Sequence, residues 1–179
     1  MGDKQILTEL IKPSALVDKE TNNDKHFVKL IESMAPDSNV IVRNLPDDAL
    51  IIKADVFHPP KEIFQDKKRE CKRADYVIIC EENKCLIYIE LKSRKDSWDI
   101  IVKQLMGAEC FIKYCREIGR AFWKTESFLE NYQSRFISIC NTSINKKPTG
   151  MDGKAKDHDK PEKAWRLYGY KNLEFNKIA

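Results

Sequence analysis

A hairpin-like stretch from Arg73 to Lys92 constrains the fold of this chain more than any other segment. Two apolar runs rich in β-branched residues, Tyr76–Cys80 and Cys85–Leu91, flank the polar tetrapeptide 81–84. Two strand-like runs separated by a short polar break are typical of a β-hairpin. We therefore expect two antiparallel strands with buried apolar side chains.

The register of this hairpin predicts which polar side chains meet. If Cys80 lies opposite Cys85, Asp75 falls opposite Glu90 on the same face, with Cβ atoms roughly 4.5–5.5 Å apart. Alternation along the strand places Lys92 on that face as well. Two carboxylates this close must share a proton, be neutralised by cations, or bind a metal ion such as Mg²⁺. A surface ion cluster would also account for them, but the apolar strands favour the metal site.

The spacing of Asp75, fourteen residues and then Glu90-Leu91-Lys92 resembles the PD-(D/E)XK signature of the restriction-endonuclease-like nucleases, with Ala74 in place of the family's proline. The resemblance implies an α/β fold with an αβββαβ core, a mixed central sheet flanked by helices. It also implies that Asp75 and Glu90 bind Mg²⁺ or Mn²⁺ together with the Leu91 carbonyl. Lys92 would position the attacking water or neutralise charge on the phosphate.

A long helix is expected from Asp96 or Ser97 to about Ile118, ended by Gly119. Gln104 lies inside its apolar stripe, where an unsatisfied amide would cost about 1–3 kcal/mol. A hydrogen bond to a neighbouring backbone group is one explanation. The other is a catalytic role facing the acids, which the resemblance favours because some branches of the family place a glutamine there.

Two further acids are weaker candidates. Apolar spacing and capping residues predict a first helix over Asp24–Met34. The family often carries an acid on this helix, and Glu32 is the candidate, but it lies nearly opposite the apolar stripe, which favours an exposed position. Asp55 falls in an expected strand, Leu50–Val56, whose register the sequence does not fix.

The basic residues are distributed unevenly. The net charge of +4 is too small to indicate nucleic acid by itself, but basic side chains crowd before Asp75 and follow Lys92. Such a run is usually a solvated loop, whereas beside a metal site it would contact a phosphate backbone. The predicted nucleic-acid contacts are Lys68, Arg69, Lys72, Arg73 and Arg94.

The remaining segments suggest one domain over residues 1–179. Weak helical spacing precedes Pro13, and a helical turn is expected at Lys61–Lys67. The polar segment Asn145–Glu162 is expected to be a mobile loop. Further strands are expected at Asn39–Arg43, Arg135–Cys140 and Trp165–Tyr170, with a short helix at Thr125–Gln133. Scattered histidines and cysteines disfavour zinc, and without a signal peptide or transmembrane run we expect a cytoplasmic protein.

The first hypothesis is therefore a metal-dependent nuclease, with DNA favoured over RNA as the substrate on family grounds. It would act in restriction, repair or antiviral defence, as a homodimer or with a larger protein partner. The alternative is a non-catalytic or partner-dependent nuclease-fold subunit that binds nucleic acid or protein. The intact Asp75, Glu90 and Lys92 argue against a degenerate site.

Overall fold

A computed structural model describes residues 1–56, 62–140 and 157–179, which form two mixed β-sheets and three α-helices in an α/β arrangement. The helices are α1 (Asp3–Leu10), α2 (Trp98–Trp123) and α3 (Phe175–Ile178). The six-stranded sheet contains, in order, β1 (Leu16–Val17), β5 (Leu50–Lys53), β6 (Tyr76–Cys80), β7 (Cys85–Lys92), β8 (Gln133–Cys140) and β9 (Trp165–Tyr168). The four-stranded sheet contains β10 (Asn172–Glu174), β4 (Ala35–Leu45), β3 (Lys25–Glu32) and β2 (Glu20–Asn22).

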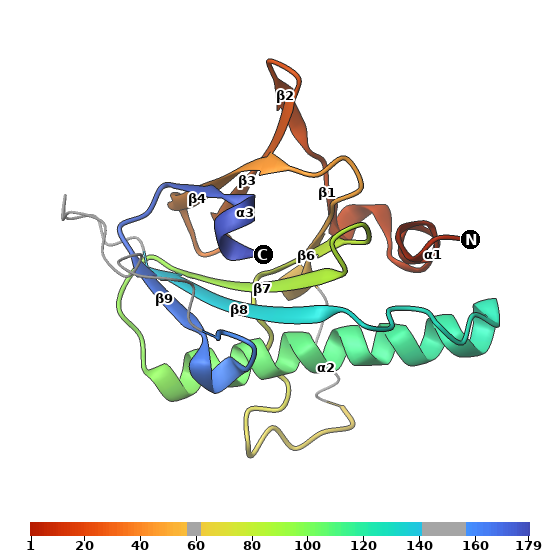
Figure 1. The fold of residues 1–179 in the computed structure, drawn as a ribbon. Coiled ribbons are helices and arrows are strands. Elements are labelled where there is room, and N and C mark those ends of the chain that lie inside the picture. The colour runs from red at the N-terminus through yellow and green to blue at the C-terminus, as the bar shows by residue number, and fades with distance from the viewer. Residues whose placement is uncertain (57–61, 141–156) are drawn as a thin grey trace.

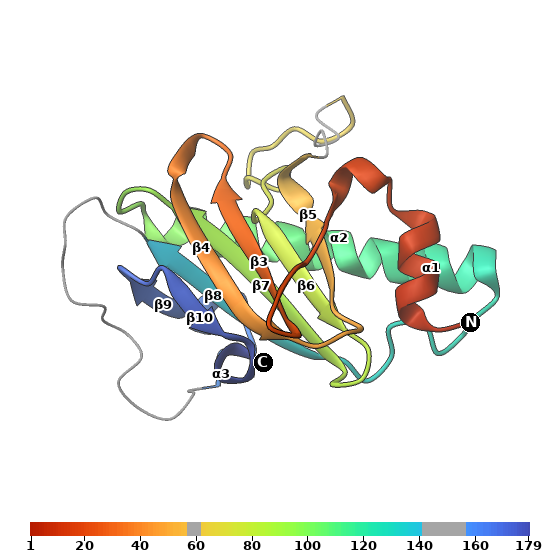
Figure 2. The ribbon, with the colours of Figure 1, turned by 90° about the horizontal axis from the view of Figure 1, so that it is seen from above.

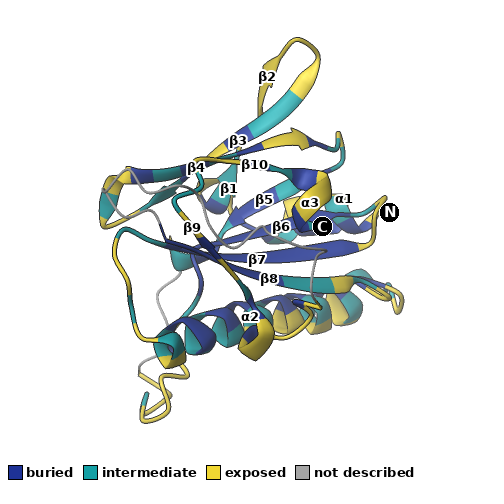
Figure 3. Ribbon diagram, turned by 60° about the vertical axis from the view of Figure 1, so that its left-hand side comes forward, coloured by how far each residue is buried: buried dark blue, intermediate teal, exposed yellow. Residues whose placement is uncertain are grey.

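The six-stranded sheet is the middle layer, with α2 on one face and the four-stranded sheet on the other (Figure 1). Seen from above, β3 and β4 lie over β6 and β7 (Figure 2). Alternation along β7 supplies both cores: Leu86 and Tyr88 pack on the α2 side, and Ile87 and Ile89 pack toward the four-stranded sheet. Because both faces are covered, β6 and β7 are buried along nearly their whole length (Figure 3).

The expected hairpin is confirmed, including its register. β6 and β7 are antiparallel, with Cys80 opposite Cys85 and Tyr76 opposite Ile89. α2 then carries the chain to β8, which pairs parallel with β7, and β9 pairs parallel with β8 at the sheet edge. The predicted strands at Arg135–Cys140 and Trp165–Tyr170 are therefore present, the second ending at Tyr168.

The predicted first helix over Asp24–Met34 is wrong, because this segment forms strand β3. Asn23 and Asp24 both have positive φ, 49° and 59°, and join β2 to β3 through a two-residue turn. Asparagine and aspartate favour such hairpin turns as well as helix N-caps. Val28 and Leu30, two positions apart on β3, are both buried in the core. The segment therefore has the alternation of a strand as well as the apolar spacing of a helix.

The other helical boundaries also differ from expectation. α2 continues past Gly119 to Trp123, because Gly119 is a packing position at which a Cβ atom would lie 2.2 Å from the Phe128 ring. Residues 126–129 form a turn instead of the predicted helix at Thr125–Gln133. Of the helical turn expected at Lys61–Lys67, Lys61 lies outside the described residues and residues 62 and 63 form a turn. Residues 145–156 of the predicted loop Asn145–Glu162 lie outside the described residues. Residues 157–160 lead into a 3₁₀ turn, Pro161–Lys163, which contains the last two residues of that segment.

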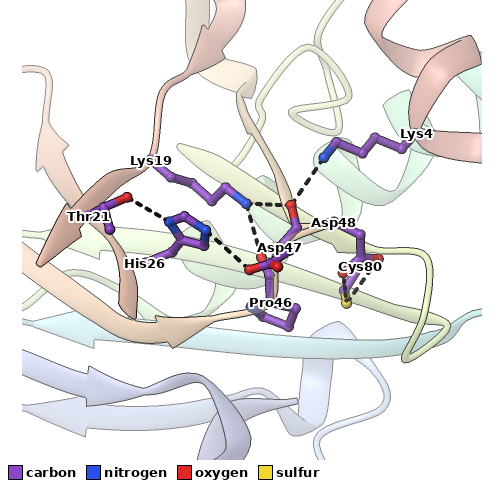
Figure 4. A network of polar contacts seen from close by, with 8 residues as sticks. All are labelled: Lys4, Lys19, Thr21, His26, Pro46, Asp47, Asp48 and Cys80. Atoms are coloured by element: carbon purple, nitrogen blue, oxygen red, sulfur yellow. Dashed lines mark hydrogen bonds and ion pairs between the residues drawn. The ribbon is translucent and has the colours of Figure 1, made fainter. Parts of the chain in front are cut away.

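A polar network ties the layers together at the turn end of the hairpin (Figure 4). Lys19 Nζ donates to the carbonyls of Pro46 and Asp47 at 3.0 and 2.6 Å, and His26 lies between Thr21 and Asp47. These contacts hold the β4–β5 connection against the β2–β3 hairpin. No helix among the described residues is long and apolar enough to cross a membrane.

Candidate functional site

Asp75 and Glu90 come together at the open end of the hairpin, as the register predicted. Asp75 directly precedes β6, and its Oδ2 accepts a 2.6 Å hydrogen bond from the Leu91 N–H. The two acids are 9% and 1% exposed. Their strand neighbours Val77 and Tyr88 pack on the α2 side, so alternation places both carboxylates on that face.

Lys92 completes the motif. Its Nζ lies 2.9 Å from Glu90 Oε1 and 3.4 Å from Asp96 Oδ2, and its side chain is 17% exposed. The ammonium group is thus held at the boundary between the buried acids and solvent. This position suits a group that must reach both a buried carboxylate and an incoming ligand.

Burial makes the two acids hard to ionise. It raises the pKa of Asp75 to about 7, with the Leu91 N–H opposing the rise and nearby Asp55 and Glu32 adding to it. Burial and the adjacent Asp75 also raise the pKa of Glu90 well above its usual value. Burial alone would lower the pKa of Lys92, but the Glu90 carboxylate raises it. The pair of acids therefore retains a proton near neutral pH unless a cation is bound.

Glu32 and Asp55 extend the acid cluster. The Tyr76 hydroxyl donates to the Ile31 carbonyl at 2.8 Å and accepts from the Ile31 N–H at 3.1 Å. This clamp fixes the end of β3, so Glu32 lies close enough to raise the pKa of Asp75. The expectation that Glu32 is an exposed surface residue is therefore wrong: it is half-buried, because it lies on a strand of the sheet above the site.

Three of these acids share a pattern of hydrogen bonding. Ser93 Oγ donates to Glu32 Oε1 at 3.4 Å, Ser33 Oγ donates to Asp55 Oδ2 at 2.6 Å, and Lys92 holds Glu90 Oε1. In each acid the second oxygen is buried without a hydrogen-bond partner among the described residues. Each carboxylate is therefore fixed in orientation while one oxygen remains available.

Gln104 is on the expected helix, and its Oε1 is also buried without a hydrogen-bond partner in the described part of the chain. The backbone bond that would explain it is not formed there, and neither is a hydrogen bond to the acids. Gln104 is therefore an available polar group beside the α2 core.

The available groups fit a hard divalent cation. All of them are oxygens, which Mg²⁺ and Mn²⁺ prefer, and Mg²⁺ commonly binds one or two carboxylates and completes its shell with water and phosphate. Over the described ranges, no three His, Cys, Asp or Glu side chains are arranged to hold a metal by themselves. Asp75 and Glu90 would therefore hold a cation only with water, substrate or the Leu91 carbonyl, whose role remains a prediction.

The predicted nucleic-acid contacts occupy two places. Lys68, Arg69 and Lys72 are exposed on the segment before Asp75, where Arg73 is half-buried, and Arg94 is exposed beyond β7. Among the described residues, Lys68, Arg69, Lys72 and Arg94 form no ion pair with the acid cluster.

Gly107 lets the basic segment approach α2. A Cβ atom at Gly107 would lie 1.7 Å from the Lys72 carbonyl oxygen, so only glycine permits this contact. The contact helps to place the chain that leads into Asp75. Sequence reasoning missed Gly107, as it missed Tyr76 and Ser93, because each acts through a contact distant in sequence that no local pattern encodes.

The chain was compared with known proteins. No family model, curated protein or solved structure matches it.

Proposed function

We propose that this chain is a Mg²⁺- or Mn²⁺-dependent nuclease of the PD-(D/E)XK type that hydrolyses phosphodiester bonds, with DNA favoured over RNA. The observation that carries the proposal is the acid cluster. The buried Asp75 and Glu90 carboxylates, both with raised pKa values, lie beside Lys92, and Glu90 Oε2 has no hydrogen-bond partner among the described residues. Groups perturbed in this way are expensive to bury and are typical of catalytic sites.

The topology supports the same proposal. β5, β6 and β7 are consecutive antiparallel neighbours, and α2 leads to the parallel strand β8. If α1 corresponds to the first helix of the family core, this order would match αβββαβ, with β1 to β4 inserted between α1 and β5. Asp75 and Glu90 lie on the α2 side of the central strands, where a substrate at the open end of the hairpin would meet them.

The side chains divide the work of hydrolysis. Asp75 and Glu90 would hold the cation, which supplies polarisation of the phosphate and a lower pKa for a bound water. Lys92, oriented by Glu90 and Asp96, would donate hydrogen bonds to a phosphate oxygen where negative charge develops. Gln104 would orient a water through its available amide. Glu32 and Asp55 would add negative charge at the rim and strengthen cation binding.

The test is cleavage of single- and double-stranded DNA and RNA with Mg²⁺, Mn²⁺ or EDTA. Glu90→Ala and Lys92→Ala should each reduce metal-dependent cleavage by at least about 100-fold. Glu82→Ala, which removes an exposed carboxylate from the turn of the same hairpin, should leave the rate unchanged.

Calorimetry with Mg²⁺ makes the test independent of the substrate chosen. The wild type should bind the cation and the Glu90→Ala protein should not. No cleavage of any substrate together with no cation binding would overturn the proposal and leave a non-catalytic, partner-dependent subunit as the function to pursue.

A further inference from the structure

A basic cavity adjoins the acid cluster at the carboxyl ends of β7, β8 and β9. It has a volume of about 130 Å³, well below the roughly 300–1,000 Å³ of pockets that enclose whole drug-sized ligands. Its lining includes Lys92, Arg94, Lys95, Trp98, Ser138 and Arg166. Lys92 belongs both to this cavity and to the acid cluster, so a ligand in one is in reach of the other.

The strand register aligns the cavity with the acids. Glu90 pairs with Ser138 on β8, and Ser138 pairs with Arg166 on β9. Paired residues of a sheet share a face, so these three residues form a row across three strands. With neighbouring strands about 4.8 Å apart, the backbones of Glu90 and Arg166 are roughly 10 Å apart.

Arg166 is arranged to receive an anion. Its guanidinium carbon lies 3.4 Å from the centroid of the Trp98 ring, and stacking on an aromatic face leaves the N–H donors in the guanidinium plane available. Among the described residues no carboxylate pairs with Arg166, Arg94 or Lys95. Among the described residues of the lining, Asp96 is the one acid, and it pairs with Lys92.

The start of α2 adds positive potential at the same place. Trp98 is the first residue of this 26-residue helix, and Ser97 at the N-cap forms no side-chain cap bond. The first N–H groups of a helix have no partner within the helix, and together with the helix dipole they favour an anion. The cavity thus combines a helix N-terminus with cationic side chains from two separate segments, residues 92–95 and strand β9.

We propose that this cavity binds a terminal phosphate of the nucleic-acid strand whose nearby phosphodiester is cut at the acid cluster, an inference that rests on the proposed nuclease function. A terminal phosphate carries about −1.5 to −2 charges and a backbone phosphodiester one. Arg94, Lys95 and Arg166, which have no carboxylate partner among the described residues, match the more highly charged group. The enzyme would therefore select phosphorylated strand ends and cut close to them.

Binding in EDTA tests this without catalysis. Fluorescence anisotropy would compare one labelled single-stranded DNA sequence with a 5′-phosphate, a 3′-phosphate or hydroxyl ends only. One phosphorylated end should bind about tenfold more tightly than the hydroxyl oligonucleotide, as expected for charge-assisted hydrogen bonds. Arg166→Gln should remove the difference. Arg116→Gln, which changes a partly exposed arginine on the distant half of α2, should preserve it.

The outcomes separate this inference from the nuclease proposal. If Arg166→Gln weakens all three oligonucleotides equally, the cavity contacts an internal phosphodiester and the inference is wrong. If it weakens none, the cavity is no phosphate site and the inference is also wrong. If the protein prefers phosphorylated ends in EDTA but cuts no substrate with Mg²⁺, the phosphate-binding inference would stand and the nuclease proposal would be wrong. Circular dichroism would establish that both variants fold.

Discussion

Both ends of the β6–β7 hairpin place carboxylates against apolar strands, but the two ends differ in how these carboxylates are hydrogen-bonded and in how their pKa values shift. At the turn, Asp48 accepts hydrogen bonds from the Glu82 N–H at 2.8 Å and the Cys80 thiol at 3.1 Å. Burial opposes its ionisation, yet these bonds hold the pKa of Asp48 below its usual value. At the open end, burial raises the pKa of Asp75 to about 7, and Glu90 has an oxygen with no partner among the described residues.

This difference in hydrogen bonding indicates a structural role for the acid at the turn and a functional role for the acids at the open end. The bonds to Asp48 stabilise the ionised acid within the fold. Asp75 and Glu90 are buried, and Glu90 Oε2 has no hydrogen-bond partner among the described residues, which lowers the stability of the protein. Such groups persist where function depends on them, and a cation would supply the missing partner.

The largest effect is expected when one acid at each end of the hairpin is replaced by its amide. Glu90→Gln should lower metal-dependent cleavage by at least about 100-fold with little loss of stability. Asp48→Asn should leave the cleavage rate of the folded protein unchanged and cost about 1–3 kcal/mol, because it disturbs a satisfied network. Cleavage rates and urea unfolding measure the two effects. Equal loss of cleavage in both variants would abolish the contrast between the ends.

The pH dependence of stability sharpens the same contrast. The pKa of Asp75 is about 7 when folded and 3.8 in its ordinary state, so between these pH values the folded protein holds a proton that the unfolded chain releases. Stability should therefore fall as pH rises from about 4 to 7, by roughly 2–4 kcal/mol. Asp75→Asn should reduce this fall, with a remainder due to Glu90, whose pKa burial also raises, and it should be the more stable protein at pH 8. Urea unfolding across this range, with no difference between the two proteins, would contradict the assignment.

A single added methyl group at Gly107 should disturb the contact between α2 and the basic segment 67–73. Gly107→Ala should cost about 1–3 kcal/mol and lower cleavage by the folded protein, since the new methyl group displaces the Lys72 carbonyl and the chain leading to Asp75. Gly119→Ala is the matched control on the same helix. It clashes with Phe128, so it should lower stability similarly and preserve cleavage. Thermal unfolding and cleavage rates distinguish the two variants.

The smallest expected effect concerns the clamp on β3. Tyr76→Phe removes both hydrogen bonds to Ile31 and should cost about 1–2 kcal/mol. Because the clamp fixes Glu32 beside the site, Mg²⁺ affinity should fall modestly, as it should in Glu32→Gln. Calorimetry on both single variants and the double variant tests the link. Additive losses would show that Tyr76 does not act through Glu32.

The sequence predicted the centre of the site because that centre is local. The polar break and the two apolar runs predict the hairpin, and the register with Cys80 opposite Cys85, assumed from the sequence and present in the structure, places Asp75 opposite Glu90. The position of Glu32 could not be predicted in this way. Its segment satisfies helical and strand periodicity equally, and only pairing with the later strand β4 selects the strand. Arg166 lies 76 residues after Glu90 in the sequence and reaches the same face through parallel strand pairing. No local sequence pattern encodes such a pairing.

The strand β10 has a consequence for the order in which the protein is completed during synthesis. Leu173, Phe175 and Ile178 are buried in the core between the two sheets, and β10 pairs with β4, about 130 residues earlier in the sequence. Until these residues leave the ribosome, the layer that carries Glu32 lacks an edge strand and part of its core. A nascent chain would therefore hold the hairpin acids long before it holds the finished cluster. The acid cluster would therefore be complete only once residues 172–178 have been synthesised and have packed against β4 and the core.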